Sequence, residues 1–153
     1  MCIRDRGEDV SAISMDRFLQ QLSTQLGRAL LTDRVGIRIK TDIECRPLGS
    51  DRATPVALFI VEAVTNSVKH GVHDGGQILI KVTDKDDIIT AQVQDSGEGI
   101  ASETKTTGMG NKLMQGFARQ LSGSYSTQTN DSGFETSISF PADIPKNPAS
   151  HIR

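Results

Sequence analysis

One helical segment constrains the fold of this chain more than any other feature. Its apolar residues nearly encircle a helix: Ala57, Leu58, Phe59, Ile60, Val61, Ala63, Val64 and Val68. Such a helix is expected to pack on most sides rather than to lie half-exposed. Polar residues three or four positions apart form a stripe on the same helix: Glu62, Asn66, Lys69 and His70. A buried carboxamide at Asn66 needs a hydrogen-bond partner, either in the neighbouring protein or in a bound ligand.

Two glycine-containing motifs follow this helix. Asp95-Ser96-Gly97-Glu98-Gly99 ends a strand-like run at residues 88–94, and its glycines let the backbone approach a flat ligand. Gly108-Met109-Gly110-Asn111 opens a second helical pattern, and a helix N-terminus offers backbone N–H groups to an anion. Each motif alone is also typical of an ordinary turn. Their order after the polar-striped helix favours a nucleotide site.

At these residues the chain resembles the ATP-binding domain of the histidine-kinase-like ATPase superfamily, which includes gyrase-type ATPases, MutL and bacterial sensor histidine kinases. The nearest resemblance is to the sensor kinases: residues 61–70 are similar to their asparagine box, and residues 95–99 and 108–110 to their two glycine boxes. Two positions depart from the pattern. Asn111 stands where an apolar residue is usual, and Phe134 follows Gly133 where a threonine is common.

The resemblance implies how these residues would bind ATP. Asp95 would accept a hydrogen bond from the exocyclic amine of adenine, and the glycine boxes would flank the purine and cover the phosphates. The implied nucleotide-binding residues are Asp95, Gly97, Gly99, His70, Thr107, Gly108, Gly110 and Asn111. Helix capping is an alternative role for both Asn111 and His70.

The resemblance also implies a Mg²⁺ ion. Asn66 would contribute its carbonyl oxygen to the Mg²⁺ that bridges the phosphates, which suits a hard cation that keeps several waters. Glu62 would hold a metal-bound water or act as a general base, and Lys69 would offset phosphate charge. Glu62, Asn66 and Lys69 are therefore the candidate catalytic residues.

The implied activity is transfer of the γ-phosphoryl group of Mg-ATP to a histidine. His70 would lie inside the nucleotide pocket, and neither His73 nor His151 has a suitable helical context. We therefore expect the acceptor on a separate dimerisation or phosphotransfer domain, with a response regulator as an indirect partner. Two alternatives stay open: an anti-sigma-factor-like serine kinase or partner-binding switch, and a degenerate docking domain that binds no nucleotide.

The order of elements predicts a two-layer α/β sandwich, with helices on one face of a mixed, mostly antiparallel sheet, and the resemblance implies the Bergerat fold. Helices are expected at residues 15–31 and 54–70 and after Gly110. Strands are expected at residues 35–43, 77–82, 88–94, 124–128 and 134–140. We expect a flexible leading segment at residues 1–14, one ATP-binding domain at residues 15–141 and a tail at residues 142–153. Residues 101–107 are expected to form a mobile lid, with a plain surface loop as the alternative.

Composition limits the other classes of function. The chain has 17 Lys and Arg against 19 Asp and Glu, and no basic block, which argues against a nucleic-acid partner. Cys2 and Cys45 have neither metal-ligand spacing nor the pattern of a disulfide framework. No apolar run approaches the length of a membrane span. We therefore expect a soluble, cytoplasmic chain that is monomeric as given.

Overall fold

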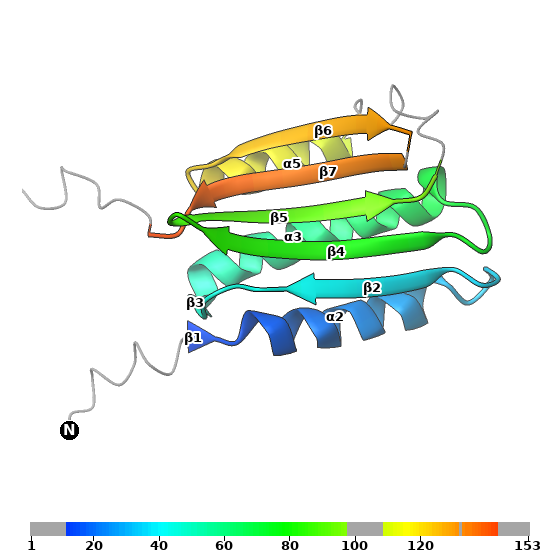
Figure 1. Cartoon of the computed structure of the whole chain (residues 1–153), viewed down its shortest axis with the longest axis horizontal. Coiled ribbons are helices and arrows are strands. Elements are labelled where there is room, and N and C mark those ends of the chain that lie inside the picture. Colours follow the sequence, from blue (N-terminus) through cyan, green and yellow to red (C-terminus); the bar gives the residue numbers. More distant parts are fainter. Residues whose placement is uncertain (1–11, 98–108, 132, 144–153) are drawn as a thin grey trace, which may run out of the picture.

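The computed structural model describes residues 12–97, 109–131 and 133–143, and within them helices cover one face of a five-stranded sheet (Figure 1). The helices are α2 (Met15–Leu30), α3 (Ser50–Asn66) and α5 (Met109–Gln120). The strands, in sheet order, are β2 (Arg38–Ile43), β4 (Gln77–Lys85), β5 (Ile88–Asp95), β7 (Gly133–Pro141) and β6 (Ser124–Asn130). β2 and β4 run parallel, and the other neighbours run antiparallel. The predicted α/β sandwich with a mixed, mostly antiparallel sheet is confirmed.

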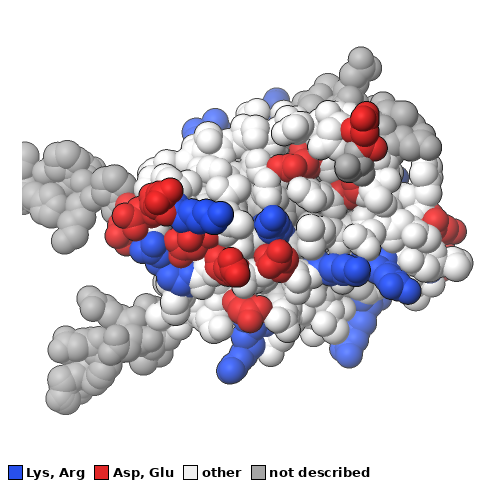
Figure 2. Space-filling view, viewed as in Figure 1, with Lys and Arg blue, Asp and Glu red and all other residues white. Residues whose placement is uncertain are grey.

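Strand residues alternate between the helix-covered face and the open face of the sheet. On β4, Ile78, Ile80 and Val82 are buried under the helices, whereas Leu79 and Lys81 are only partly buried. This period of two is what the strand geometry requires when only one face is covered. On the open face, basic and acidic side chains are interspersed rather than gathered by sign (Figure 2).

The central helix α3 supplies much of the core but is not surrounded. Its Phe59, Ile60 and Val64 have essentially no exposed surface. The sheet, α2 and α5 all contact this helix, as the prediction of a helix packed on most sides requires. Leu58, in contrast, is 45% exposed, so one side of α3 faces solvent.

The C-terminal turn of the predicted helix at residues 54–70 has a different geometry. α3 begins four residues earlier, at Ser50, and ends at Asn66; the chain continues as the π-helix η1 (Ser67–Gly71). The backbone N–H of Val72 donates to the carbonyl of Ser67 over 2.8 Å, the five-residue spacing of a π turn. π turns are rare and occur frequently at functional sites.

Two very short strands were not predicted from the sequence. β1 (Ala12–Ile13) pairs antiparallel with β3 (Leu48–Gly49). β1 lies inside the segment, residues 1–14, that was predicted to be a flexible leader. The rest of that leader, the predicted lid at 101–107 and the tail beyond residue 143 lie outside the described residues. Among the described helices, none is long and apolar enough to cross a bilayer.

Candidate functional site

The first turn of α5 lies directly against the C-terminal half of α3. A Cβ atom at Gly110 would lie 2.4 Å from Oε2 of Glu62 and 3.5 Å from Nδ2 of Asn66. Glu62 and Asn66 are half-buried and one helical turn apart, so both side chains face the start of α5. The fold thus brings together one carboxylate, one carboxamide and the N-terminal turn of a helix. Only glycine leaves this space open.

Asp95 ends β5 on the helix-covered face of the sheet. Its side chain is buried, with 4% of its surface exposed, and it accepts a hydrogen bond from the backbone N–H of Gly97 over 3.0 Å. A Cβ at Gly97 would lie 1.7 Å from the carbonyl oxygen of Gly71. The first glycine box therefore touches the residue that directly follows the asparagine box. Two segments of the predicted site, more than twenty residues apart in sequence, meet at backbone distance.

Lys69 and His70 lie in the π turn and are exposed. The prediction of one α-helical stripe through Glu62, Asn66, Lys69 and His70 therefore fails after Asn66. A π turn holds more residues than an α turn, so the last two side chains leave the register set by the first two. They remain at the same end of the helix, next to the Gly71–Gly97 contact.

Several predicted site residues have other outcomes. Asn111 lies in the first turn of α5 and is half-buried. Gly99, Thr107 and Gly108 lie outside the described residues, as does the lid to which Thr107 was assigned.

Behind the site lies a small cavity of about 10 Å³ that the sequence analysis did not anticipate. Its lining comes from α3, η1, α5, β6 and β7: Ala63, Asn66, Ser67, Met114, Tyr125, Phe134 and Thr136. The hydroxyl of Tyr125, one of these lining residues, is buried without a hydrogen-bond partner among the described residues, and burial raises the pKa of Tyr125. The alternating pattern of the last two strands was the only available signal for these residues.

Phe134 is the departure from the family pattern that lies closest to the predicted adenine contact. It is the ladder partner of Asp95 across β5 and β7, and it is 5% exposed. An apolar ring therefore stands beside Asp95 where the resemblance expects a hydroxyl. The ring also lines the small cavity that Asn66 reaches.

The described residues contain no group of three or more His, Cys, Asp or Glu side chains that would hold a metal ion by themselves. A Mg²⁺ ion needs less, because it keeps several waters and takes further ligands from substrate phosphates. Oε2 of Glu62 and the carboxamide of Asn66, which meet at Gly110, are groups of the kind that such an ion takes from a protein.

The comparisons with known proteins agree on one family. Residues 51–143 match the model of the histidine kinase-, DNA gyrase B-, and HSP90-like ATPases. The sensor protein LytS of Staphylococcus epidermidis is 29% identical over 86% of this chain, which spans about a quarter (25%) of LytS. The anti-sigma F factor of Bacillus licheniformis is 31% identical over 47% of this chain and 60% of its own length.

Solved structures agree with the fold. The histidine kinase domain of the blue-light activated histidine kinase from Erythrobacter litoralis EL346 superposes with a TM-score of 0.74. The superposed region is 88% of this chain and 67% of the kinase-domain chain, at 14% sequence identity. At this identity the likeness concerns the arrangement of helices and strands.

Proposed function

The chain belongs to the histidine kinase-, DNA gyrase B- and HSP90-like ATPase family, and from this membership we propose that it transfers the γ-phosphoryl group of Mg-ATP to a histidine on a separate domain or chain. It is an ATP-binding domain of the histidine kinase type. One observation carries the assignment of residues: Glu62, Asn66 and Gly110 meet around a space that a single Cβ would fill.

Each residue has a distinct task in this proposal. Asp95, buried at the end of β5, accepts the hydrogen bond of the adenine amine and rejects a base that lacks this donor. The backbone N–H groups at the start of α5 face the phosphates, and Lys69 offsets their charge. Asn66 would hold Mg²⁺ directly and Glu62 would hold it through water, and the ion would neutralise charge on the phosphates.

The transfer itself requires little covalent chemistry from the protein. A nitrogen of the acceptor imidazole attacks the γ-phosphorus, the bond to the bridging oxygen breaks, and ADP leaves. In this proposal Glu62 takes the proton that the imidazole loses, as a general base. Most of the acceleration in such reactions comes from positioning and from charge stabilisation.

The partners in this proposal follow from the sensor-protein relatives. LytS is a sensor protein, and this chain spans a quarter of its length. We infer that the acceptor histidine lies on a dimerisation or phosphotransfer domain, and that a response regulator receives the phosphoryl group from it.

Calorimetric titration tests the nucleotide site directly. We expect saturable binding of ATP with Mg²⁺, loss of binding in Asp95→Ala, and a loss mainly of the Mg²⁺ dependence in Asn66→Ala. Asp42→Ala, which removes an exposed carboxylate on β2, is the control and should bind as the unmodified chain does. Circular dichroism establishes that each variant is folded. Absence of binding by the folded, unmodified chain would contradict the proposal and favour a docking domain.

A serine kinase or partner-binding switch is the second candidate, favoured by the similarity to the anti-sigma F factor over 47% of the chain. The two candidates differ in the phosphorylated product. Phosphohistidine is hydrolysed in acid, whereas phosphoserine survives it. Incubation with radiolabelled ATP and a histidine phosphotransfer domain, followed by acid treatment, should release the label; an acid-stable product would favour the second candidate.

A further inference from the structure

The guanidinium of Arg34 joins two loops beside the candidate nucleotide site. Arg34 lies between α2 and β2, with 26% of its side chain exposed. Its Nη1 donates to the carbonyl of Val68 over 2.6 Å, and its Nη2 donates to the carbonyl of Val72 over 2.7 Å. Its Nε donates to Oδ1 of Asp74 over 2.9 Å. The two carbonyls lie on either side of Lys69 and His70.

These contacts provide hydrogen-bond donors for carbonyl groups at the end of the π turn. The last carbonyls of a helix have no partner within the helix, and they carry the negative end of its dipole. A guanidinium offers several N–H groups in a rigid fork together with a fixed positive charge. Arg34 thereby satisfies one acceptor inside η1 and one just beyond it, which a lysine, with a single ammonium, would not span in the same way.

Further contacts join the same two loops. The backbone N–H of Gly75 donates to the carbonyl of Val35 over 2.8 Å, and the backbone N–H of Arg38 donates to the carbonyl of Gly76 over 3.1 Å. Hydrogen bonding to Arg34 also lowers the pKa of Asp74, so this carboxylate stays ionised. The π turn is therefore held by Arg34 and by the close contact of Gly71 with Gly97.

We propose that Arg34 is a positioning residue for the phosphate end of the ATP site, because it holds the backbone of η1 from which Lys69 and His70 project. The inference rests on the proposed function. Asp95 at the adenine end is positioned by β5, which pairs with β4 and β7 at this residue. Loss of Arg34 should therefore affect the two ends of the nucleotide unequally.

The test compares a nucleotide with phosphates and one without. We expect Arg34→Lys to weaken binding of Mg-ATP about tenfold, the size of one impaired hydrogen bond to a charged group, and to change adenosine binding by less than about twofold. Equal losses for Mg-ATP and adenosine, or no loss for either, would overturn the proposal. Asp74→Asn keeps both contacts of Arg34 with the carbonyls, so its affinities for Mg-ATP and adenosine should be close to those of the unmodified chain.

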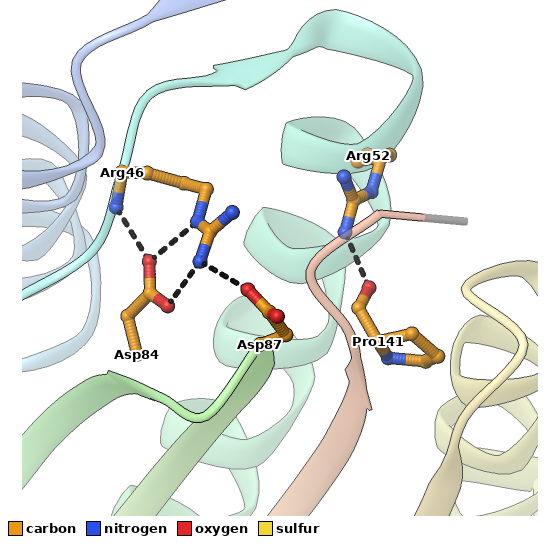
Figure 3. A network of polar contacts seen from close by, with 5 residues as sticks. All are labelled: Arg46, Arg52, Asp84, Asp87 and Pro141. Carbon is orange, nitrogen blue, oxygen red and sulfur yellow. Dashed lines mark hydrogen bonds and ion pairs between the residues drawn. The ribbon is translucent and has the colours of Figure 1, made fainter. Parts of the chain in front are cut away.

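Arg46→Lys is the matched control, because the guanidinium of Arg46 also makes several hydrogen bonds to a segment remote in sequence, the β4–β5 hairpin. It contacts Asp84 and Asp87 at the opposite end of the sheet (Figure 3). We expect this variant to leave the ratio of Mg-ATP to adenosine affinity unchanged, even if it unfolds at a lower temperature. A similar change of the ratio in both variants would show a general loss of stability and overturn the proposal.

Hydrogen exchange tests whether Arg34 holds the π turn, which we call the clamp, independently of nucleotide binding. The amide of Val72 closes the π turn, so in the nucleotide-free chain its exchange should accelerate in Arg34→Lys and not in Arg46→Lys. Unchanged exchange at Val72 would refute the clamp whatever the binding data show. If the unmodified chain bound no ATP, the proposed function and the positioning role would fail, and accelerated exchange would establish the clamp alone.

Discussion

Gly110 is the residue at which the candidate site is most sensitive to one methyl group. In Gly110→Ala the new Cβ would lie 2.4 Å from Oε2 of Glu62. Glu62 ends in a flexible side chain, so we expect it to swing away and the fold to survive. Alanine also favours a helix by up to about 1 kcal/mol over glycine. Calorimetry should show Mg-ATP binding weakened about tenfold or more, with little change in the melting temperature.

Gly116→Ala is the control for this prediction, because Gly116 lies on the same helix and a Cβ there would meet nothing within 4 Å. It should gain about 0.5–1 kcal/mol of stability and bind Mg-ATP normally. Weakened binding in both variants would show that helix propensity, rather than displacement of Glu62, controls the site. Unchanged Mg-ATP binding in Gly110→Ala would mean that the position of Glu62 does not contribute to binding.

Cys45 offers a prediction independent of the nucleotide. Burial and the nearby charge of Asp84 raise the pKa of its thiol to about 11. Since the thiolate is the reactive form, iodoacetamide at pH 8.5 should label Cys45 at least about tenfold more slowly in the folded chain than in urea. Cys2→Ser removes the other thiol from the assay. The raised pKa stabilises the folded chain below pH 9, and this contribution is lost as the pH rises through 11. Equal labelling rates in both states would contradict the burial.

At the level of elements, the β4–β5 hairpin is tied to the segment before β3 by one arginine. Asp84 accepts hydrogen bonds from the backbone N–H and the guanidinium of Arg46, and the side-chain contact lowers its pKa (Figure 3). A lowered pKa stabilises the folded state above the unfolded pKa, near 4, and that contribution is lost as the pH falls through the folded pKa. Asp84→Asn should therefore be less stable than the unmodified chain at pH 7, and the difference should be smaller at pH 2.

Urea denaturation at the two pH values measures this difference. Asp86→Asn is the control, since Asp86 is an exposed neighbour in the same turn and its positive φ of 54° is one that asparagine tolerates. It should leave the pH dependence unchanged. A difference in stability between Asp84→Asn and the unmodified chain that was as large at pH 2 as at pH 7 would assign the effect to packing rather than to charge.

Elements with a strong period could be predicted from the sequence, and those formed by tertiary contacts could not. Alternation located β4 and β5, and the glycine boxes marked the ends of β5 and the start of α5. β1 and β3, two residues each, are too short to show a period. The π turn η1 depends on Arg34 and Gly97, which are remote in sequence, so local pattern predicted an α-helix there. Tyr125 and Thr136 reach the site only through sheet register.

For the whole molecule, ATP binding should stabilise the fold cooperatively, because the proposed site joins α3, β5 and α5, which come from separate parts of the chain. At a concentration 100 times the dissociation constant, a ligand that binds only the folded state adds about 2.7 kcal/mol. For a chain of this size that corresponds to a rise in melting temperature of roughly 5–11 °C.

GTP presents a carbonyl where adenine presents its amine, so the buried carboxylate of Asp95 would lose its donor and meet a second acceptor. Thermal melts with Mg-ATP should therefore show the rise, whereas Mg-GTP, and either nucleotide with Asp95→Ala, should not. Equal shifts with ATP and GTP would mean that the phosphates alone are recognised, and that Asp95 does not read the base.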